Sequence, residues 1–377
     1  MRLWSLPGPG HFLDQAMAAL REGSNVVMPM PLHGMPSLSR ALEQRLHADG
    51  WDCHPVCDDG GAPVEQLFAA LGLDDGGSVR RTVSLLRQCM KPGQVVLIHG
   101  VRSSSWRAWK LFLNEYEQAS RSVGMIERPL VALLTEGVPL QEMPERGAAL
   151  RVLECDNVIG EIDVLLFTTS LLRNVVRADY KMKLMARVIC RLALWDLEIA
   201  RFLTEQKPES LLEPQRILGE AIRELGMPDS LTRTWESGGI QRFDDVECVH
   251  PFIVVREGDV HQELTMRLWA AQAAEVLPAL ELQRRILVRR MRGLVSMPMT
   301  VDGTTYDDLD DMEIGPLSHV ANTRQLSNAI RLTANKLKRL RNSLAHLEAL
   351  DATDVFDEDL YRHGPVDRDL AVVTPSK

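Results

Sequence analysis

The chain has 377 residues, of which 45% are apolar and 25% charged, so its length and composition allow about two or three domains with their own cores. A net charge of −9 gives no overall attraction for a polyanion, and nucleic-acid binding would need a local basic face. The six cysteines form no CxxC pair, no apolar run reaches about 18 residues, and the N-terminus lacks the apolar core of a signal peptide. These features predict a cytoplasmic protein with no metal, no cofactor and no membrane span.

Five short apolar runs recur in the first 155 residues, with amphipathic segments between them. Alternation of continuously apolar strands with helices is typical of a parallel sheet that is buried on both faces. The predicted strands are 25–30, 53–56, 95–100, 129–137 and 150–155, and helices are predicted over 37–50, 78–90 and 103–122. The sequence therefore predicts an α/β fold with a five-stranded parallel sheet.

This spacing resembles the core of P-loop ATPases of the AAA+ and STAND type. In that fold the loop after the first strand reads G-x-x-x-x-G-K-[ST] and binds phosphate and magnesium, while the third strand ends in an acidic metal ligand. Here Gly34 stands at the second glycine, Met35 at the lysine and Pro36 at the hydroxyl. Ser37 comes one place too late for the hydroxyl, and the third strand ends at His99 in place of an acid.

Because all three chemical groups are missing together, we predict that residues 1–158 form a degenerate P-loop-like domain without ATPase activity. Two alternatives stay open. The domain is an ordinary doubly wound fold unrelated to ATPases, or it binds a nucleotide weakly at Gly34 and Ser37 without hydrolysis. The helix N-terminus that follows, at residues 36–38, is a place where an anion could bind.

The rest of the chain is predicted to be mostly α-helical. Residues 159–250 resemble the helical lid that follows such a core and form a connector. Residues 251–350 contain a helical segment (261–295), which is either one long helix or two helices with a bend at Pro278. An acidic connection (301–315) and a second long helix (323–350) follow. Long helices joined by short links predict a helical bundle. Residues 351–377 are predicted to be an acidic, loosely held tail.

The last long helix contains "KRLRNSLAHL" at residues 338–347. Four residues separate Arg341, which is followed by Asn342, from His346, and six residues separate Arg339 from it. This resembles the R-x(4–6)-H motif of the HEPN superfamily, over about a quarter of the chain. The resemblance implies a metal-independent endoribonuclease whose site is built by two protomers. His346 would then transfer a proton, an arginine would stabilise the charged phosphorane, and Asn342 would orient the histidine or a phosphate.

Helical geometry at about 100° per residue separates the two arginines. Leucines that include Leu337, Leu340 and Leu344 form one stripe, and His346 points roughly opposite to it. Arg339 falls on the side of His346, together with Asn335 and Asn342, whereas Arg341 lies near the edge of the stripe. Geometry therefore favours Arg339 as the partner of His346, and the family pattern favours Arg341. Both remain candidates.

The preceding long helix carries arginines that we predict to contact RNA phosphates. They are Arg284, Arg285, Arg289, Arg290 and Arg292. Alternatively, they form a solvated face paired with the acidic segment 307–313. A P-loop-like domain joined to a HEPN-like bundle resembles prokaryotic anti-phage and toxin-like systems. The resemblance implies a homodimer through the C-terminal bundle, an RNA substrate and partner proteins from a defence operon. The alternatives are a non-catalytic scaffold subunit of the same fold and an unrelated helical bundle.

Overall fold

The structure is a computed structural model that describes residues 3–73, 80–120, 124, 128–145, 147, 149–173, 175–260 and 262–362. It divides into two compact units. The first unit comprises residues 1–170, 193–200 and 219–257, and the second comprises 171–192, 201–218 and 258–377. Residues 159–250, predicted as a connector, are therefore shared between the two units.

The first unit contains the predicted five-stranded parallel sheet. Its strands are β1 (Asn25–Met30), β2 (Asp52–Cys57), β3 (Gln94–Arg102), β4 (Leu130–Glu136) and β5 (Leu150–Val152). They are ordered β2-β3-β4-β1-β5, and every pairing between neighbours is parallel. In register, Val27 of β1 pairs with Leu133 of β4 and with Val152 of β5. The α/β fold and the position of each strand are confirmed.

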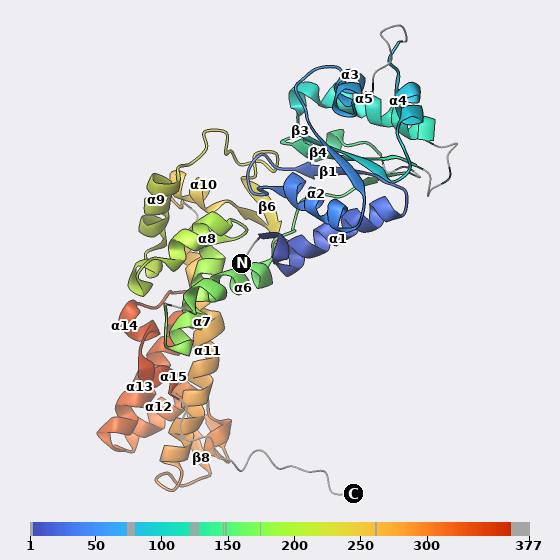
Figure 1. Cartoon of the computed structure of the whole chain (residues 1–377). Helices are drawn as coiled ribbons and strands as arrows, with labels where there is room; N and C mark the ends of the chain where they lie inside the picture. Colours follow the sequence, from blue (N-terminus) through green and yellow to red (C-terminus); the bar gives the residue numbers. More distant parts are fainter. Residues whose placement is uncertain are drawn as a thin grey trace, which may run out of the picture. The chain divides into compact units, whose positions relative to one another are not determined.

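Helices cover both faces of this sheet, which explains why its central strands carry continuous apolar runs. Helices α1 (Pro7–Arg21) and α2 (Leu38–Ala48) lie on one face, and α3 (Pro63–Ala70), α4 (Val83–Cys89) and α5 (Ser103–Ser120) lie on the other (Figure 1). Trp106, Trp109 and Tyr116 of α5 are buried in the core with Val27, Ile98 and Leu133 of the sheet. The aromatic residues of α5 thus pack the core.

Residues 159–257, which follow the sheet in the sequence, are mostly helical, contain only one short β-hairpin and contribute to both units. It contains α6 (Glu161–Leu172), α7 (Asp179–Ala193), α8 (Leu197–Thr204), α9 (Pro214–Leu225), the hairpin β6 (Ile240–Phe243) and β7 (Val246–Val249), and α10 (Pro251–Arg256). Short 3₁₀ turns occupy Leu3–Ser5, Leu140–Glu142, Pro208–Leu212 and Leu309–Asp311. No helix among the described residues is long and apolar enough to cross a membrane.

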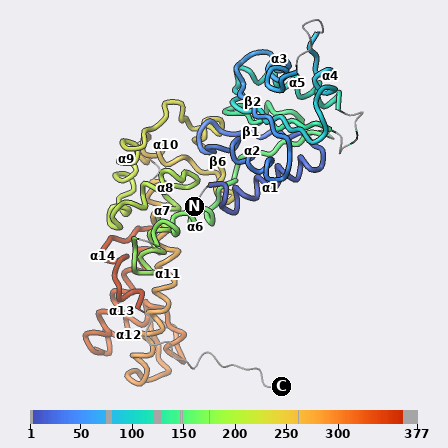
Figure 2. Tube along the Cα trace, in the orientation of Figure 1, coloured from blue at the N-terminus to red at the C-terminus, as the bar shows by residue number. Residues whose placement is uncertain are grey.

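The second unit is built around two long helices. Its main elements are α11 (Glu263–Met291), the hairpin β8 (Met299–Val301) and β9 (Thr304–Tyr306), α12 (Ile314–Thr323) and α13 (Asn328–Ala345). Helix α13 packs against both α11 and α12 (Figure 2). Helix α11 continues through Pro278 as one element. Helix α13 is shorter at both ends than the helix predicted over 323–350. Helix α12 lies between the acidic connection and α13, and α13 starts after Ser327, whose hydroxyl caps it.

The acidic segment after α13 is folded as far as the structure describes it. Two short helices, α14 (Ala352–Val355) and α15 (Glu358–Tyr361), bury the side chains of Val355 and Leu360. Gln283 of α11 donates hydrogen bonds to the carbonyl oxygens of Leu360 and Arg362, at 3.1 and 2.9 Å. The prediction of a loosely held tail is therefore wrong for residues 351–362, while 363–377 lie outside the described residues.

Candidate functional site

An open, shallow depression of about 360 Å³ lies on one face of α13 and the turn that follows it. It is lined by Asn335, Lys338, Arg339, Asn342, Ser343, His346 and Glu348. Three of the four predicted catalytic residues, Arg339, Asn342 and His346, are thus brought together. The fourth, Arg341, does not line the depression. The separation of the two arginines follows from helical geometry, because residues three, four and seven positions apart share a face.

The opposite face of α13 fixes the helix in the second unit. Leu337, Leu340 and Leu344 are buried there, with relative exposures of 3%, 0% and 1%. Burial of three leucine side chains stabilises this packing by several kcal/mol, at about 1.5–3 kcal/mol for each. The depression is therefore the solvent-facing side of a helix whose other side belongs to the core.

The end of α13, where His346 lies, is held by side chains of α11. The indole Nε1 of Trp269 donates a hydrogen bond to the carbonyl oxygen of Leu344 at 2.8 Å. Just beyond, the buried amide of Gln272 bonds to both backbone polar groups of Leu350. His346 is the C-cap residue, and its backbone N–H donates to the carbonyl oxygen of Asn342 at 2.9 Å. Backbone contacts thus place His346 while its side chain stays exposed.

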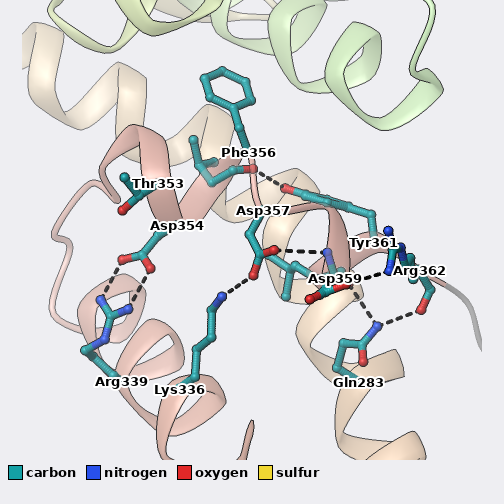
Figure 3. Close-up of polar contacts among 12 residues, drawn as sticks. Gln283, Lys336, Arg339, Thr353, Asp354, Phe356, Asp357, Asp359, Tyr361 and Arg362 are labelled. Carbon is teal, nitrogen blue, oxygen red and sulfur yellow. Dashed lines mark hydrogen bonds and ion pairs between the residues drawn. The ribbon is translucent and has the colours of Figure 1, made fainter. Parts of the chain in front are cut away.

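Arg339 is bound by a carboxylate from the segment after α13. Its Nη1 and Nη2 atoms donate to Oδ2 and Oδ1 of Asp354 at 2.5 and 2.6 Å, in a two-pronged ion pair (Figure 3). The side chain of Asp354 is 8% exposed and that of Arg339 is 56% exposed. The hydrogen bonds to Asp354 raise the pKa of the Arg339 guanidinium above its ordinary value. Arg339 is therefore a permanent cation, exposed on its outer side and anchored on its inner side.

Arg341 faces a different neighbour. Its Nη2 atom lies 3.1 Å from Oε2 of Glu313, the residue that precedes α12, and both side chains are exposed. This ion pair lies on the α12 side of α13. The arginine that the family pattern favours and the one that helical geometry favours therefore have separate partners, and only Arg339 shares a surface with His346.

Three lining residues were not singled out from the sequence. Lys338 and Ser343 could have been found by spacing, since they precede Asn342 and His346 by four and three positions, one helical turn. Glu348 could not, because α13 ends at Ala345 and Leu347 has a left-handed φ of 61° that turns the chain. Glu348 adds a carboxylate to a depression that otherwise carries cations and neutral donors.

The arginines of α11 are partly committed to local contacts. Arg284 pairs with Glu281 and donates to the carbonyl oxygens of Asp310 and Met312 at 3.0 and 2.9 Å. Arg292 pairs with Asp308 and Asp310. These contacts agree with the alternative interpretation, in which the arginines form a solvated face that pairs with the acidic segment 307–313. Arg285 lies 3.6 Å from Glu281, and Arg289 and Arg290 are exposed at the end of the helix. Contact of all five with RNA remains a prediction.

The loop after β1 is filled by the chain's own residues. The N–H of Leu32 donates to the carbonyl oxygen of Glu236 at 2.8 Å, and Nε2 of His33 lies 2.8 Å from Oγ of Ser230. A Cβ atom on Gly34 would lie 3.0 Å from Nε2 of Gln241 and 3.7 Å from Cδ1 of Trp195. Gln241 and Trp195 therefore occupy the space beside Gly34.

The neighbouring positions of the loop agree with this filling. Met35, at the place of the lysine, is buried, and Ser37 is exposed with a left-handed φ of 63° and does not cap α2. At the end of β3, His99 pairs in register with Cys57 of β2. Gly34 and Ser37 thus do not form a joint cradle, and nucleotide binding by them remains a prediction. Among the described residues no cluster of three or more His, Cys, Asp or Glu side chains could hold a metal ion.

A polar pair, formed by the buried His250 and the partly exposed Asp196, supports the same region. Oδ1 of Asp196 accepts hydrogen bonds from the N–H groups of Glu198 and Ile199, and its Oδ2 lies 3.1 Å from Nε2 of His250. Burial by itself would raise the pKa of Asp196, but these hydrogen bonds and the histidine charge outweigh it and lower the pKa. Burial, and then the nearby His250, lower the pKa of His33. The pair braces the segment that closes the loop after β1.

No protein-family model matches the chain, and no curated protein matches it. Solved structures with a similar chain include a Drosophila ORC bound to DNA, at 12% identity and a TM-score of 0.34, over 56% of this chain and 64% of that chain. The chain thus spans less than two thirds of that ORC chain. Two Thermotoga maritima RuvB variants are similar at 14% and 12% identity, with TM-scores of 0.34 and 0.33. These matches cover 67% and 65% of this chain and 96% and 92% of those chains.

ORC and RuvB are AAA+ P-loop ATPases. At these identities and TM-scores the likeness carries no argument about activity, ligands or partners. The class of the first unit rests on its own topology, which is an α/β fold with a five-stranded parallel sheet and helices on both faces.

Proposed function

We propose that the chain acts on RNA through the depression on α13, as a HEPN-type endoribonuclease whose complete site is formed by two copies. The observation that carries this proposal is the shared surface of Arg339, Asn342 and His346. A permanent cation, an amide and a titratable imidazole within two helical turns are the groups that metal-independent phosphodiester cleavage requires. The exposed position of all three leaves them accessible to a large substrate.

The proposed reaction assigns each residue a role. The 2′-hydroxyl oxygen of RNA bonds to the adjacent phosphorus while the bond from phosphorus to the 5′-oxygen breaks. His346 takes the hydroxyl proton or supplies one to the leaving oxygen. Arg339 stabilises the charge that builds up on the phosphorane oxygens, and Asn342 orients the imidazole or a phosphate oxygen. Arg341 is the alternative cation if the second copy contacts α13 on the side that faces α12, where Arg341 pairs with Glu313.

Dimerisation through the second unit is part of the proposal. Two exposed leucines, Leu332 and Leu347, stand on α13 and directly after it, with relative exposures of 61% and 49%. Apolar side chains at both ends of a polar depression suit a symmetric contact between two copies of the helix. Light scattering of the full chain tests this, with a dimer expected and a strict monomer counting against the two-copy site.

The activity test compares the full chain with His346→Ala on total RNA. Cleavage by the full chain should fall by on the order of 10²–10⁴-fold in the variant, the range for loss of a general acid–base. His319→Ala is the matched control, because His319 is an exposed histidine of α12 that does not line the depression. Equal cleavage by the two variants would remove His346 from the mechanism.

The first unit is proposed to sense a signal or dock a partner without hydrolysing ATP, as part of a prokaryotic anti-phage or toxin-like system. Supporting this are the missing lysine and acid of the P-loop pattern and the filled loop after β1. The pairing of such a domain with a HEPN-like bundle supports the defence setting by resemblance.

A second function has its own support. Arg339 is already bound by Asp354 and Arg341 by Glu313. A non-catalytic scaffold subunit of a defence complex needs stable surfaces more than free catalytic groups, and both ion pairs serve that role. If the unmutated full chain forms a stable dimer but does not cleave RNA, the scaffold function is favoured.

A further inference from the structure

Two ion pairs join α13 to the segment that follows it, and they are spaced in the same way on both sides. Lys336 and Arg339 stand three residues apart on α13, one helical turn. Their partners, Asp357 and Asp354, also stand three residues apart. Nζ of Lys336 contacts Oδ2 of Asp357, and Arg339 holds both carboxylate oxygens of Asp354 (Figure 3). Two carboxylates thus match two cations, of which Arg339 lines the depression and Lys336 lies one helical turn before it on α13.

The segment that carries these carboxylates is independently anchored. Tyr180 of α7 donates a hydrogen bond to the carbonyl oxygen of Phe356 at 3.3 Å, and its ring stacks on that of Tyr361 at 4.4 Å between centroids. Val355 and Leu360 are buried. The segment therefore has anchors besides the two ion pairs, so that loss of those pairs loosens it without unfolding it.

The cations keep an open side. The relative exposures are 56% for Arg339 and 39% for Lys336, against 8% and 20% for Asp354 and Asp357. A guanidinium binds a carboxylate and a phosphate with the same two-pronged geometry. A phosphodiester that enters the depression from solvent thus meets Arg339, and a strand that extends one helical turn further reaches Lys336 and competes with both carboxylates.

We propose that residues 351–362, the acidic strap, form a built-in competitor that occupies the phosphate-binding cations Arg339 and Lys336 until an RNA backbone displaces it. This regulation rests on the proposed action on RNA. The strap sets a threshold: RNA must supply enough phosphate contacts to replace two ion pairs, one of which leaves Asp354 nearly buried without its cation. Short or isolated anions do not meet that threshold, whereas a continuous RNA strand does.

The test measures binding of a fluorescent single-stranded RNA in the full chain, with His346→Ala as background so that the RNA stays uncut. Asp354→Asn combined with Asp357→Asn should lower the Kd by about tenfold, the change expected when a competing charge pair is removed. Asp359→Asn combined with Glu358→Gln is the matched control. It removes the same charge from the strap, but both residues pair only with Arg362 and lie off α13.

Folding is checked separately, because Asp354 is nearly buried. Each variant is used only at temperatures below its Tm, and the single variant Asp357→Asn, at the more exposed pair, should give part of the gain. In the unmutated strap, amide hydrogen exchange at 351–362 should become faster when RNA binds. An equal gain in the control, or no gain in either strap variant together with unchanged exchange, overturns the proposal.

Cleavage by chains that retain His346 separates this proposal from the function beneath it. Tighter RNA binding by the strap variants without any cleavage would support the acidic strap as a competitor and contradict the proposed ribonuclease activity. Cleavage that is equal in the full chain and the strap variants, with equal Kd values, leaves the ribonuclease and removes the competitor. Absence of RNA binding by every variant at low salt overturns both.

Discussion

Gln272 and Leu350 are paired in both directions across the second unit. The Nε2 atom of Gln272 donates to the carbonyl oxygen of Leu350 at 3.0 Å, and the N–H of Leu350 donates to Oε1 of Gln272 at 2.6 Å. Gln272 is fully buried in α11, and its side-chain amide satisfies both the backbone N–H and the backbone carbonyl of Leu350. The turn that carries His346 and Glu348 is closed by this contact.

Gln272→Met should therefore lower stability without changing the side-chain volume much. Both backbone groups of Leu350 would lose their partner in a buried place, at a cost of about 2–4 kcal/mol. Thermal unfolding of the full chain should show a lower Tm. A Tm equal to that of the parent would mean that water replaces the amide and that the turn does not depend on Gln272.

The two arginines of α13 should differ in their effect on stability. Arg339→Ala leaves the carboxylate of Asp354 nearly buried and unpaired, and we expect a loss of about 1–2 kcal/mol, below the range for fully buried pairs because Arg339 is half exposed. Arg341→Ala breaks an exposed pair with Glu313 and should cost less than about 1 kcal/mol. Urea unfolding of both variants measures the difference, and equal losses would contradict the assignment.

Gly238 should resist substitution more than any comparable glycine with a left-handed backbone. A Cβ atom at Gly238 would lie 2.2 Å from the carbonyl oxygen of His33, and its φ is +87°. Gly238→Ala should cost on the order of 3 kcal/mol or more, through strain and a backbone clash. Gly226→Ala is the control, because Gly226 has a φ of +78° but open space around it, and should cost about 1–2 kcal/mol. Comparable unfolding midpoints for the two variants would argue against a tight closure of the loop.

Stability should fall in acid partly through Asp196. The folded-state pKa of Asp196 is lowered, so its contribution is fully present above the ordinary aspartate pKa and is lost as pH falls through the lowered value. The free energy of unfolding should therefore drop as pH falls from about 5 through the ordinary aspartate pKa and on to the lowered one, and less steeply in Asp196→Asn. Parallel pH profiles for the two proteins would show that the pair with His250 does not drive this dependence.

ATP should not stabilise the protein. A ligand raises Tm only if it binds the folded state, and the loop after β1 is filled by Trp195, Gln241 and the 230–238 segment. Thermal shift with millimolar ATP and magnesium should give the Tm of the unliganded protein. A Tm that climbs with the logarithm of ATP concentration would restore the alternative of weak binding at Gly34 and Ser37.

The strands were predictable from sequence because a parallel strand that is buried on both faces is apolar over a continuous run, as in 26–30 and 130–134. The face shared by Arg339, Asn342 and His346 was predictable because it needs only the rotation per residue of one helix. Both signals are local, and both survive in the structure.

What could not be predicted depends on residues far apart in sequence or on polar packing. The loop at 32–34 contacts residues near 230–241, about two hundred positions away in the sequence. The spacing of apolar residues along the chain does not predict such a long-range contact. Helix α12 was missed because its acidic approach and Pro316 are typical of a loop, although proline is tolerated in the first turn of a helix. The folding of residues 351–362 was missed because their burial depends on Gln283 and Tyr180.

The chain passes between the two units repeatedly, at residues 170–171, 192–193, 200–201, 218–219 and 257–258. A unit assembled from discontinuous stretches cannot be lifted out of a gene as one piece. A cut near residue 250 would strip the second unit of residues 171–192 and 201–218, which include most of α7. The second unit is therefore expected to fold only as part of a chain that also carries these stretches.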